Sequence, residues 1–456
     1  MQKQEFIQLV NDLIIPLFTG SSLEGEEEST IRDAEVAQGN GGTILCKMKK
    51  TDDYRLIIKR EQPFKKFEIQ LVRAILEELN NVYKYNITEG AYKKSLQQYA
   101  LEKAICKSVT EKSFDTLLNL IYELSKWATR TYEGGRPTFG FIISPRNISD
   151  KTKTPIHFSK IITRDFSTML SDGINGVMFI NSKGMLLNYV HLPNISDQNV
   201  YAPYDYIKMA KACKNGRVGI ALTVNSDLLI FSEGELVFAK RRGSWSSFSH
   251  DEIIRKMSDK SKSEVQEAVY LSALDTSFSN TGACICYLKK DQEKNALKHI
   301  DIYDIMSKDL YLAKVGILNA RNLVERIEDA ENSDKPLNSE IKGFPEDFNE
   351  FLEGEKADKA CALVKIVGDK KFHELDRKLR AELLGIDGAT IIDYDGNILC
   401  IGAIVEIEAG SSGGGRLAAA RTLAKYGVSM KISMDSTISC YGFDTKKNKV
   451  RTLFSI

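Results

Sequence analysis

Two stretches of the sequence resemble each other and recur in the same order, which restricts the chain to folds built from two similar parts. NGVMFINSKGML begins at Asn175 and DGATIIDYDGNIL begins at Asp387, an offset of 212 residues. VGIALTVNSDLLIF from Val218 and VSMKISMDSTISCY from Val428 align without a gap at an offset of 210 residues. Alternating apolar positions around central turn residues predict a strand, a turn and a strand in each stretch. Several matches in one order favour duplication over chance.

A helix precedes the second hairpin of each copy, and each helix ends in a glycine, at Gly216 and Gly427. Glycine accepts the left-handed backbone conformation with which many helices end. A buried-strand pattern lies upstream in both copies, as FGFII from Phe139 and ACICYL from Ala283. The distance from this strand to the first hairpin is about 68 residues longer in the second copy, which predicts an insertion over roughly 290–357.

These patterns predict an α/β fold with mixed sheets flanked by helices, in which two similar lobes follow a small N-terminal α+β region. We expect the N-terminal region, sensor-like or helical, over residues 1–115, the first lobe over 116–250 and the second lobe over 260–456. Within the N-terminal region, the polar, Gly- and Glu-rich stretch from Ser21 to about Gly42 reads as a linker or mobile loop.

Composition narrows the class of protein. The chain has 456 residues, a formal net charge of +1, 43% hydrophobic residues and 27% charged residues, as ordinary globular proteins have. This balance gives no support for broad binding to nucleic acid or to a membrane surface, and no uncharged apolar run approaches the length of a membrane span. The eight cysteines include no C-x-x-C pair. They predict reduced thiols in a cytoplasmic protein, with neither a disulfide framework nor a zinc site.

The segment SSGGGRLAAARTLAKYG, from Ser411 to Gly427, places three glycines directly before an alanine-rich helix. The first turn of a helix exposes unpaired backbone N–H groups, and glycines leave room for an anion to reach them. The segment therefore predicts a phosphate-binding loop. The alternative is a flexible loop that happens to precede a helix.

The order of a buried strand, a DGA strand–turn–strand, a Gly/Arg-rich loop, an alanine-rich helix and a closing hairpin resembles the diadenylate cyclase (DAC) domain family. The residues that carry the resemblance are Asp387-Gly388-Ala389, the stretch 411–420 and the hairpin that ends at Tyr441. Members of the family bind ATP in two domains placed face to face, and they join the two ATP molecules into cyclic di-AMP with a divalent metal. The resemblance implies ATP or a related nucleotide as ligand here, Mg²⁺ or Mn²⁺ as cofactor, and a homo-oligomer.

The predicted site gathers around these motifs. A carboxylate can hold a metal that neutralises phosphate charge, and an arginine can grip a phosphate through two parallel hydrogen bonds. Asp387 is the predicted catalytic residue and metal ligand, and Asp435 is either a second metal contact or a plain turn residue. Taken alone, Asp387 would read as a strand-end residue and Arg416 as a solvent-facing helix residue. The predicted nucleotide-binding residues are Gly388, Ala389, Ser411, Ser412, Gly413, Gly414, Gly415 and Arg416.

The two copies depart from the family pattern in different ways. Asn175 stands where the second copy has Asp387, and residues 204–206 (Tyr-Asp-Tyr) stand where it has 415–417 (Gly-Arg-Leu). The first copy therefore predicts a degenerate site, used as structural support or as a ligand-sensing pocket. In the second copy Leu417 replaces the histidine of the family, which nucleotide binding survives better than catalysis. Three functions stay open: a diadenylate cyclase or related dinucleotide synthase, a nucleotide or cyclic-dinucleotide sensor, and a scaffold without a ligand.

Overall fold

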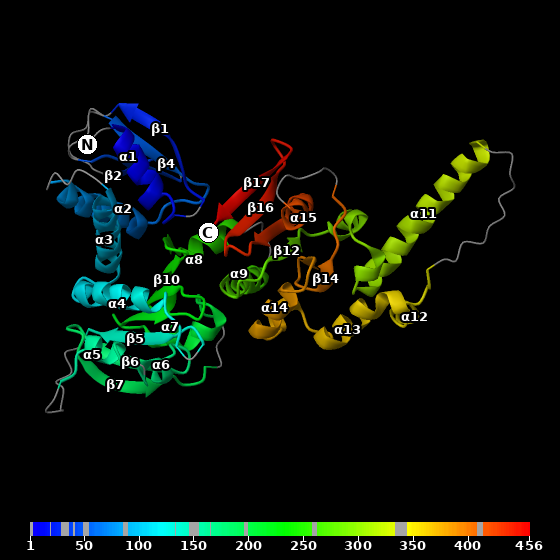
Figure 1. Ribbon diagram of the computed structural model, residues 1–456. Coiled ribbons are helices and arrows are strands. Elements are labelled where there is room, and N and C mark those ends of the chain that lie inside the picture. Colours follow the sequence, from blue (N-terminus) through cyan, green and yellow to red (C-terminus); the bar gives the residue numbers. More distant parts are fainter. Residues whose placement is uncertain are drawn as a thin grey trace. The chain divides into compact units, whose positions relative to one another are not determined.

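The computed structural model divides the chain into two compact units, residues 1–253 with Ile456 and residues 254–455 (Figure 1). The boundary predicted near residue 250 lies beside this division, and the one predicted near residue 115 lies inside the first unit. Both stay predictions about separately folding domains. The residues that the structure describes are 3–18, 20–28, 36–39, 42–48, 54–84, 90–132, 134–145, 155–164, 166–195, 199–257, 262–332, 344–407 and 414–456.

The first unit begins with a four-stranded antiparallel sheet and three helices. These elements are α1 (Lys3–Leu9), β1 (Ser22–Glu28), β2 (Val36–Gln38), β3 (Thr43–Cys46), β4 (Tyr54–Lys59), α2 (Lys66–Tyr83) and α3 (Gly90–Val109). The strand order is β1-β4-β3-β2. The stretch expected as a linker contains β1, an edge strand in which Glu24 pairs with Lys59 at 2.8 Å and Glu26 pairs with Lys3 at 2.5 Å. That part of the expectation is wrong because the backbone ladder to β4, and not an apolar pattern, holds this strand.

The first unit continues with a seven-stranded sheet and its helices. These elements are α4 (Phe114–Trp127), β5 (Phe139–Ser144), α5 (Phe158–Ile162), α6 (Phe166–Leu170), β6 (Gly176–Asn181), β7 (Leu186–His191), α7 (Ile207–Ala212), β8 (Val218–Leu222), β9 (Leu228–Ser232), β10 (Glu235–Arg241) and β11 (Ser244–Ser247). The strand order is β11-β10-β9-β8-β5-β6-β7, with β5 and β6 parallel. One hydrophobic cluster includes Phe6 and Ile44 from the N-terminal part as well as Phe139 and Trp245 from this sheet, so the two parts share a core.

The second unit is built around a six-stranded sheet. Its sheet strands and covering helices are α9 (Ser263–Phe278), β12 (Ala283–Leu288), β13 (Ala389–Ile392), β14 (Ile398–Ala403), α15 (Gly415–Leu423), β15 (Gly427–Ile432), β16 (Ile438–Asp444) and β17 (Lys449–Ser455), and α8 (His250–Met257) lies at the division between the units. The strand order is β14-β13-β12-β15-β16-β17. All six residues of β12 are buried, and both α9 and α15 contact this strand. A central strand covered on both faces explains the continuous apolar run ACICYL.

The two larger sheets repeat one another down to the pairing of individual residues. The order β7-β6-β5-β8-β9-β10 in the first unit corresponds to β14-β13-β12-β15-β16-β17 in the second. In the parallel pairs, Phe141 lies opposite Met178, and Ile285 lies opposite Thr390. These partners are offset by 144 and 212 residues, the same offsets that relate the strands in the sequence. The α/β fold with mixed sheets flanked by helices is therefore confirmed.

The two copies differ in the crossover that joins their parallel strands. It covers residues 145–175 in the first copy and 289–388 in the second, where the insertion over roughly 290–357 was expected. The helices of this longer crossover are α10 (Glu293–Ala296), α11 (Lys308–Asn332), α12 (Phe348–Leu352), α13 (Asp358–Val367) and α14 (Arg377–Leu384). Across the described parts of the chain, every helix is too short or too polar to cross a membrane.

A buried ion pair joins α14 to α9 and so positions the chain that leads into β13. Arg377 donates hydrogen bonds of 2.7 and 2.8 Å, from Nε and Nη2, to the two carboxylate oxygens of Asp275. Both side chains are buried, and Arg380 is buried near them. Burial and the charge of Arg377 lower the pKa of Arg380 to about 10. Asp275 is thus the carboxylate that offsets the charge of this arginine-rich contact.

We expect Asp275→Asn to lower the free energy of unfolding by about 3–5 kcal/mol, because the variant leaves buried guanidinium charge without its carboxylate. Urea unfolding followed by circular dichroism measures this change. Lys378→Met is the matched control, since it removes an exposed charge from the same helix and leaves the buried pair intact. Equal midpoints for wild type and Asp275→Asn would show that the pair does not hold α14 to α9.

Candidate functional site

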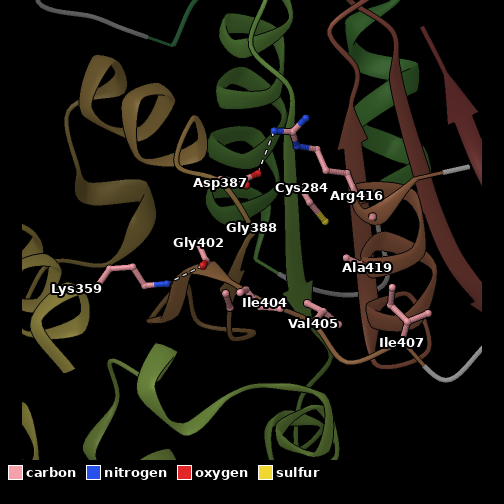
Figure 2. A pocket seen from close by; sticks show the side chains of 12 residues that line it. Cys284, Lys359, Asp387, Gly388, Gly402, Ile404, Val405, Ile407, Arg416 and Ala419 are labelled. Atoms are coloured by element: carbon pink, nitrogen blue, oxygen red, sulfur yellow. Dashed lines mark hydrogen bonds and ion pairs between the residues drawn. The ribbon is translucent and has the colours of Figure 1, made fainter. Parts of the chain in front are cut away.

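A pocket of about 660 Å³ lies in the second unit, between the ends of β13 and β14, the start of α15, and α13 of the long crossover (Figure 2). Ligand pockets in proteins commonly have volumes of this order. Its lining combines charged groups, backbone and apolar side chains. The lining residues are Cys284, Lys359, Asp387, Gly388, Gly402, Ala403, Ile404, Val405, Ile407, Gly415, Arg416 and Ala419.

The structure brings the two predicted charged residues together in this pocket. Arg416 Nη2 lies 3.2 Å from Asp387 Oδ1. The Asp387 side chain is 95% exposed and the Arg416 side chain 36%. A carboxylate this accessible gains little from a surface ion pair, so an incoming anion or cation can replace either partner at small cost.

The Arg416 guanidinium lies directly over Gly282, the residue before β12. A Cβ atom at Gly282 would come within 2.5 Å of Arg416 Nη1, so a side chain there would displace the guanidinium. Arg416 Nε is buried and has no hydrogen-bond partner among the described residues. Sequence reasoning missed Gly282, because its role depends on a side chain that is distant in the sequence.

Gly388 is required by the sheet and not by a ligand. Its φ is +112°, and a Cβ atom there would lie 2.4 Å from the carbonyl carbon of Gly402 and 2.8 Å from the carbonyl oxygen of Ala403. Gly402 has a φ of +63° and would in turn meet the backbone oxygen of Asp387 at 2.8 Å. The two glycines therefore let β13 and β14 approach closely at the pocket. This contact explains the glycine of the DGA motif, whose predicted role was close approach to a nucleotide.

The N-terminus of α15 faces the pocket through Gly415 and Arg416. Gly414 is the N-cap residue, with a φ of +81°, and a Cβ atom at Gly414 or Gly415 would meet no atom within 4 Å. The space beside this helix end is therefore open, as the phosphate-loop prediction requires. Ser411, Ser412 and Gly413 lie outside the described residues.

Three other residues of the sequence-based site lie away from the lining. Ala389 is fully buried in β13. Asp435 lies in the turn between β15 and β16, where its Oδ1 accepts a hydrogen bond of 3.1 Å from the Thr437 backbone N–H. Its predicted metal role stays a prediction that no contact with the pocket supports. Leu417 packs against the hydrophobic core of the second unit, so the position of the family histidine is turned to the core.

Sequence reasoning also missed two charged residues of the long crossover. Lys359, in α13, lines the pocket and donates a hydrogen bond of 2.8 Å to the carbonyl oxygen of Gly402. Its ammonium group also pairs with Asp304, whose Oδ2 accepts a hydrogen bond of 2.9 Å from the Ile404 backbone N–H. No local pattern could have revealed Lys359, because residues 55 positions apart make this ion pair.

Cys284 is a pocket residue without nucleophilic character. Burial raises the pKa of its thiol to about 12, and the nearby charge of Arg416 offsets this only in part. The thiol is therefore protonated near neutral pH and acts as a small apolar group.

The described residues include no group of three or more His, Cys, Asp or Glu side chains that could hold a metal ion. Magnesium bound with a nucleotide commonly takes one or two carboxylates from the protein and the rest of its ligands from phosphates and water. Asp387 alone therefore fits an ion that arrives with a nucleotide, and it does not make a metal site by itself.

The corresponding position in the first unit is closed by its own hydrogen bonds. Asn175 donates from its side-chain amide to Asp172 Oδ2 at 2.9 Å, and Asp172 Oδ1 accepts the backbone N–H groups of Ile174, Asn175 and Gly176. Burial alone would raise the pKa of Asp172, but these hydrogen bonds hold it below its usual value. Tyr206, at the place of Leu417, is buried and stacks on Phe231. Asn175 thus has a structural role.

Comparison with known proteins finds a single named neighbour. No protein-family model matches the chain, and no curated protein matches it. A crystal structure of a double mutant of DacA from Staphylococcus aureus is distantly similar, with 12% sequence identity over 41% of this chain and 85% of the DacA chain. The TM-score is 0.21. At this level the likeness carries no argument about the site, so function is argued from the residues of this chain.

We expect Gly388→Ala to lower the free energy of unfolding by about 2–4 kcal/mol, because the new methyl group overlaps the Gly402 backbone at a positive φ. Gly415→Ala is the matched control: it lines the same pocket in open space, and alanine favours a helix over glycine. Its stability should be equal to wild type or slightly higher. Thermal unfolding followed by circular dichroism separates the two variants, and a Gly388→Ala protein as stable as wild type would contradict the close strand contact.

Proposed function

We propose that the pocket of the second unit binds ATP or a related nucleotide, and that the protein is a nucleotidyltransferase of the diadenylate cyclase type. One observation supports this more than any other. Asp387, Gly388, Gly415 and Arg416 come from two motifs separated in the sequence, and they line one pocket of nucleotide size. The resemblance to the diadenylate cyclase domain family, which drew attention to these motifs, did not depend on that arrangement.

The pocket offers separate surroundings for phosphate and for base. Arg416 and the first turn of α15 are the phosphate-binding groups, because both present N–H donors and positive charge. Apolar residues occupy the other side of the lining, and Ile404 is 75% exposed there. An exposed isoleucine in a pocket gains from covering a flat base. A ligand with a charged end and an aromatic end suits both parts.

Binding a nucleotide changes the partners of the ion pair between Arg416 and Asp387. A phosphate group offers Arg416 a bidentate acceptor, which is a stronger partner than an exposed carboxylate. Asp387 is then available to a divalent cation that accompanies the phosphates. Such a cation, Mg²⁺ or Mn²⁺, would be held by Asp387 and would offset the negative charge of the reacting phosphates.

Joining two ATP molecules into cyclic di-AMP requires two bound nucleotides. A ribose hydroxyl of each attacks the α-phosphate of the other, and each attack releases pyrophosphate and a proton. The first unit has Asn175 held by Asp172 in place of Asp387, so it lacks the equivalent carboxylate. We therefore propose that two chains bring their second units together, and that the rate rises faster than linearly with protein concentration.

A second candidate is a nucleotide or cyclic-dinucleotide sensor without catalysis. Leu417 favours it, because the position of the family histidine is part of the core. No histidine is among the described residues that line the pocket, which leaves proton transfer to Asp387, water or the substrate. Both candidates require the same binding site, and they differ in whether dinucleotide is formed.

We expect Arg416→Ala to weaken ATP binding by at least about tenfold, because a charge-assisted contact of this kind contributes about 1.5–3 kcal/mol. Isothermal titration calorimetry with Mg²⁺ measures the change. Arg421→Ala is the matched control, since it removes an exposed arginine from the same helix without touching the pocket. Equal affinities for wild type and Arg416→Ala would show that the phosphate-binding assignment is wrong.

Incubation of the purified protein with ATP and Mg²⁺ or Mn²⁺, with products read by mass spectrometry, distinguishes the two candidates. An active cyclase should lose several orders of magnitude of rate in Asp387→Asn, because this variant keeps the size of the side chain and removes the charge that holds the metal. Asp395→Asn, an exposed aspartate outside the lining, should stay active. ATP binding with no dinucleotide under either metal would leave the sensor and remove the enzyme.

A further inference from the structure

The long crossover, absent from the first copy, contributes a cation to the pocket. Lys359 lies in the first turn of α13, and its side chain is 42% exposed. It contacts the Gly402 carbonyl oxygen and the Asp304 carboxylate. An ammonium group has three N–H donors, and within the described residues these contacts occupy two of them. One donor therefore remains for a ligand in the pocket that Lys359 lines.

Asp304 positions this lysine and part of the pocket rim together. It lies in a short 3-10 turn, Ile302–Asp304, and is only 7% exposed. One carboxylate oxygen pairs with Lys359, while the other accepts the Ile404 backbone N–H. The crossover is thus attached at the point where Gly402 leads into the rim.

Lys359 and Arg416 approach the pocket from different elements, with Asp387, Gly388 and Gly402 between them (Figure 2). Each cation is paired with one carboxylate, Asp304 for Lys359 and Asp387 for Arg416. Two such separated cations suit a ligand whose negative charge extends over more than one phosphate group.

We propose that Lys359 is a second phosphate-binding residue and makes the pocket selective for nucleoside polyphosphates over monophosphates. This inference rests on the proposed nucleotide-binding function. In the bound state Lys359 keeps its contact with Gly402 and gives its remaining donor to a phosphate oxygen. Asp304 acts as a positioning residue, and its charge weakens the attraction of Lys359 for the phosphate.

A purely structural ion pair predicts a different response to mutation. If Lys359 and Asp304 only attach the crossover to the sheet, removing either partner damages the pocket and weakens binding. If Lys359 binds phosphate, removing the two partners has opposite effects, because Asp304 competes with the ligand for the lysine. Asp304→Asn keeps an oxygen that can accept the Ile404 N–H, so it changes charge with little change in shape.

Calorimetry with Mg²⁺–ATP, and competition of AMP against a fluorescent ATP analogue, test the inference on the full chain. Lys359→Met should weaken ATP binding by about tenfold or more, and AMP binding by a smaller factor. Asp304→Asn should tighten ATP binding by about two- to fivefold. Lys359→Arg should restore most of the affinity, which separates lost charge from lost folding. Lys365→Met, an exposed lysine of the same helix outside the lining, should match wild type.

The failures of the two proposals are distinguishable. Weaker binding in both Lys359→Met and Asp304→Asn would identify a structural pair and overturn this inference, as would equal losses for ATP and AMP. With Arg416→Ala still impaired, the proposed function would stand in either case. A wild-type protein that binds no ATP would overturn the proposed function and this inference together.

Discussion

The close approach of Gly388 to Gly402 is the contact on which the candidate site depends. Both residues have a positive φ, and each lies where a Cβ atom would overlap the backbone of the other strand. On one side the chain continues back to Asp387, and on the other it continues into Ile404 and the pocket rim. The Gly402 carbonyl also accepts the hydrogen bond from Lys359. Without this backbone contact, the acidic group, the rim and the lysine would not surround one space.

The sheets could be predicted from the sequence because their signal is local and repeated. Alternating apolar residues and glycine-ended helices occur twice with constant offsets, and these offsets reappear in pairs such as Phe141 with Met178 and Ile285 with Thr390. The edge strand β1 could not be predicted, because its acidic residues show no apolar alternation. Edge strands exposed to water need no such pattern, so a polar segment reads as a loop.

The candidate site divides in the same way. Asp387 and Arg416 stand in recognisable motifs, and their placement in one pocket followed from the order of strands and helix. Gly282, Asp304 and Lys359 were invisible, since each acquires its role only from a distant partner. Asp435 shows the reverse: an acidic residue near a motif that the fold leaves in a turn. Composition and spacing describe neighbours along the chain, whereas a pocket is made of neighbours across it.

The unequal crossovers bear on how such a chain can change over time. Residues 145–175 and 289–388 connect strands that pair in the same register, although one connection is far longer than the other. Closing a longer connection costs little additional entropy, so sequence can accumulate there while the sheet stays as it is. In the second copy the added helices reach the pocket, whereas the sheet core is specified by the repeated strands. Ligand preference and architecture are therefore written in separate stretches of one gene, and selection can act on the first without eroding the second.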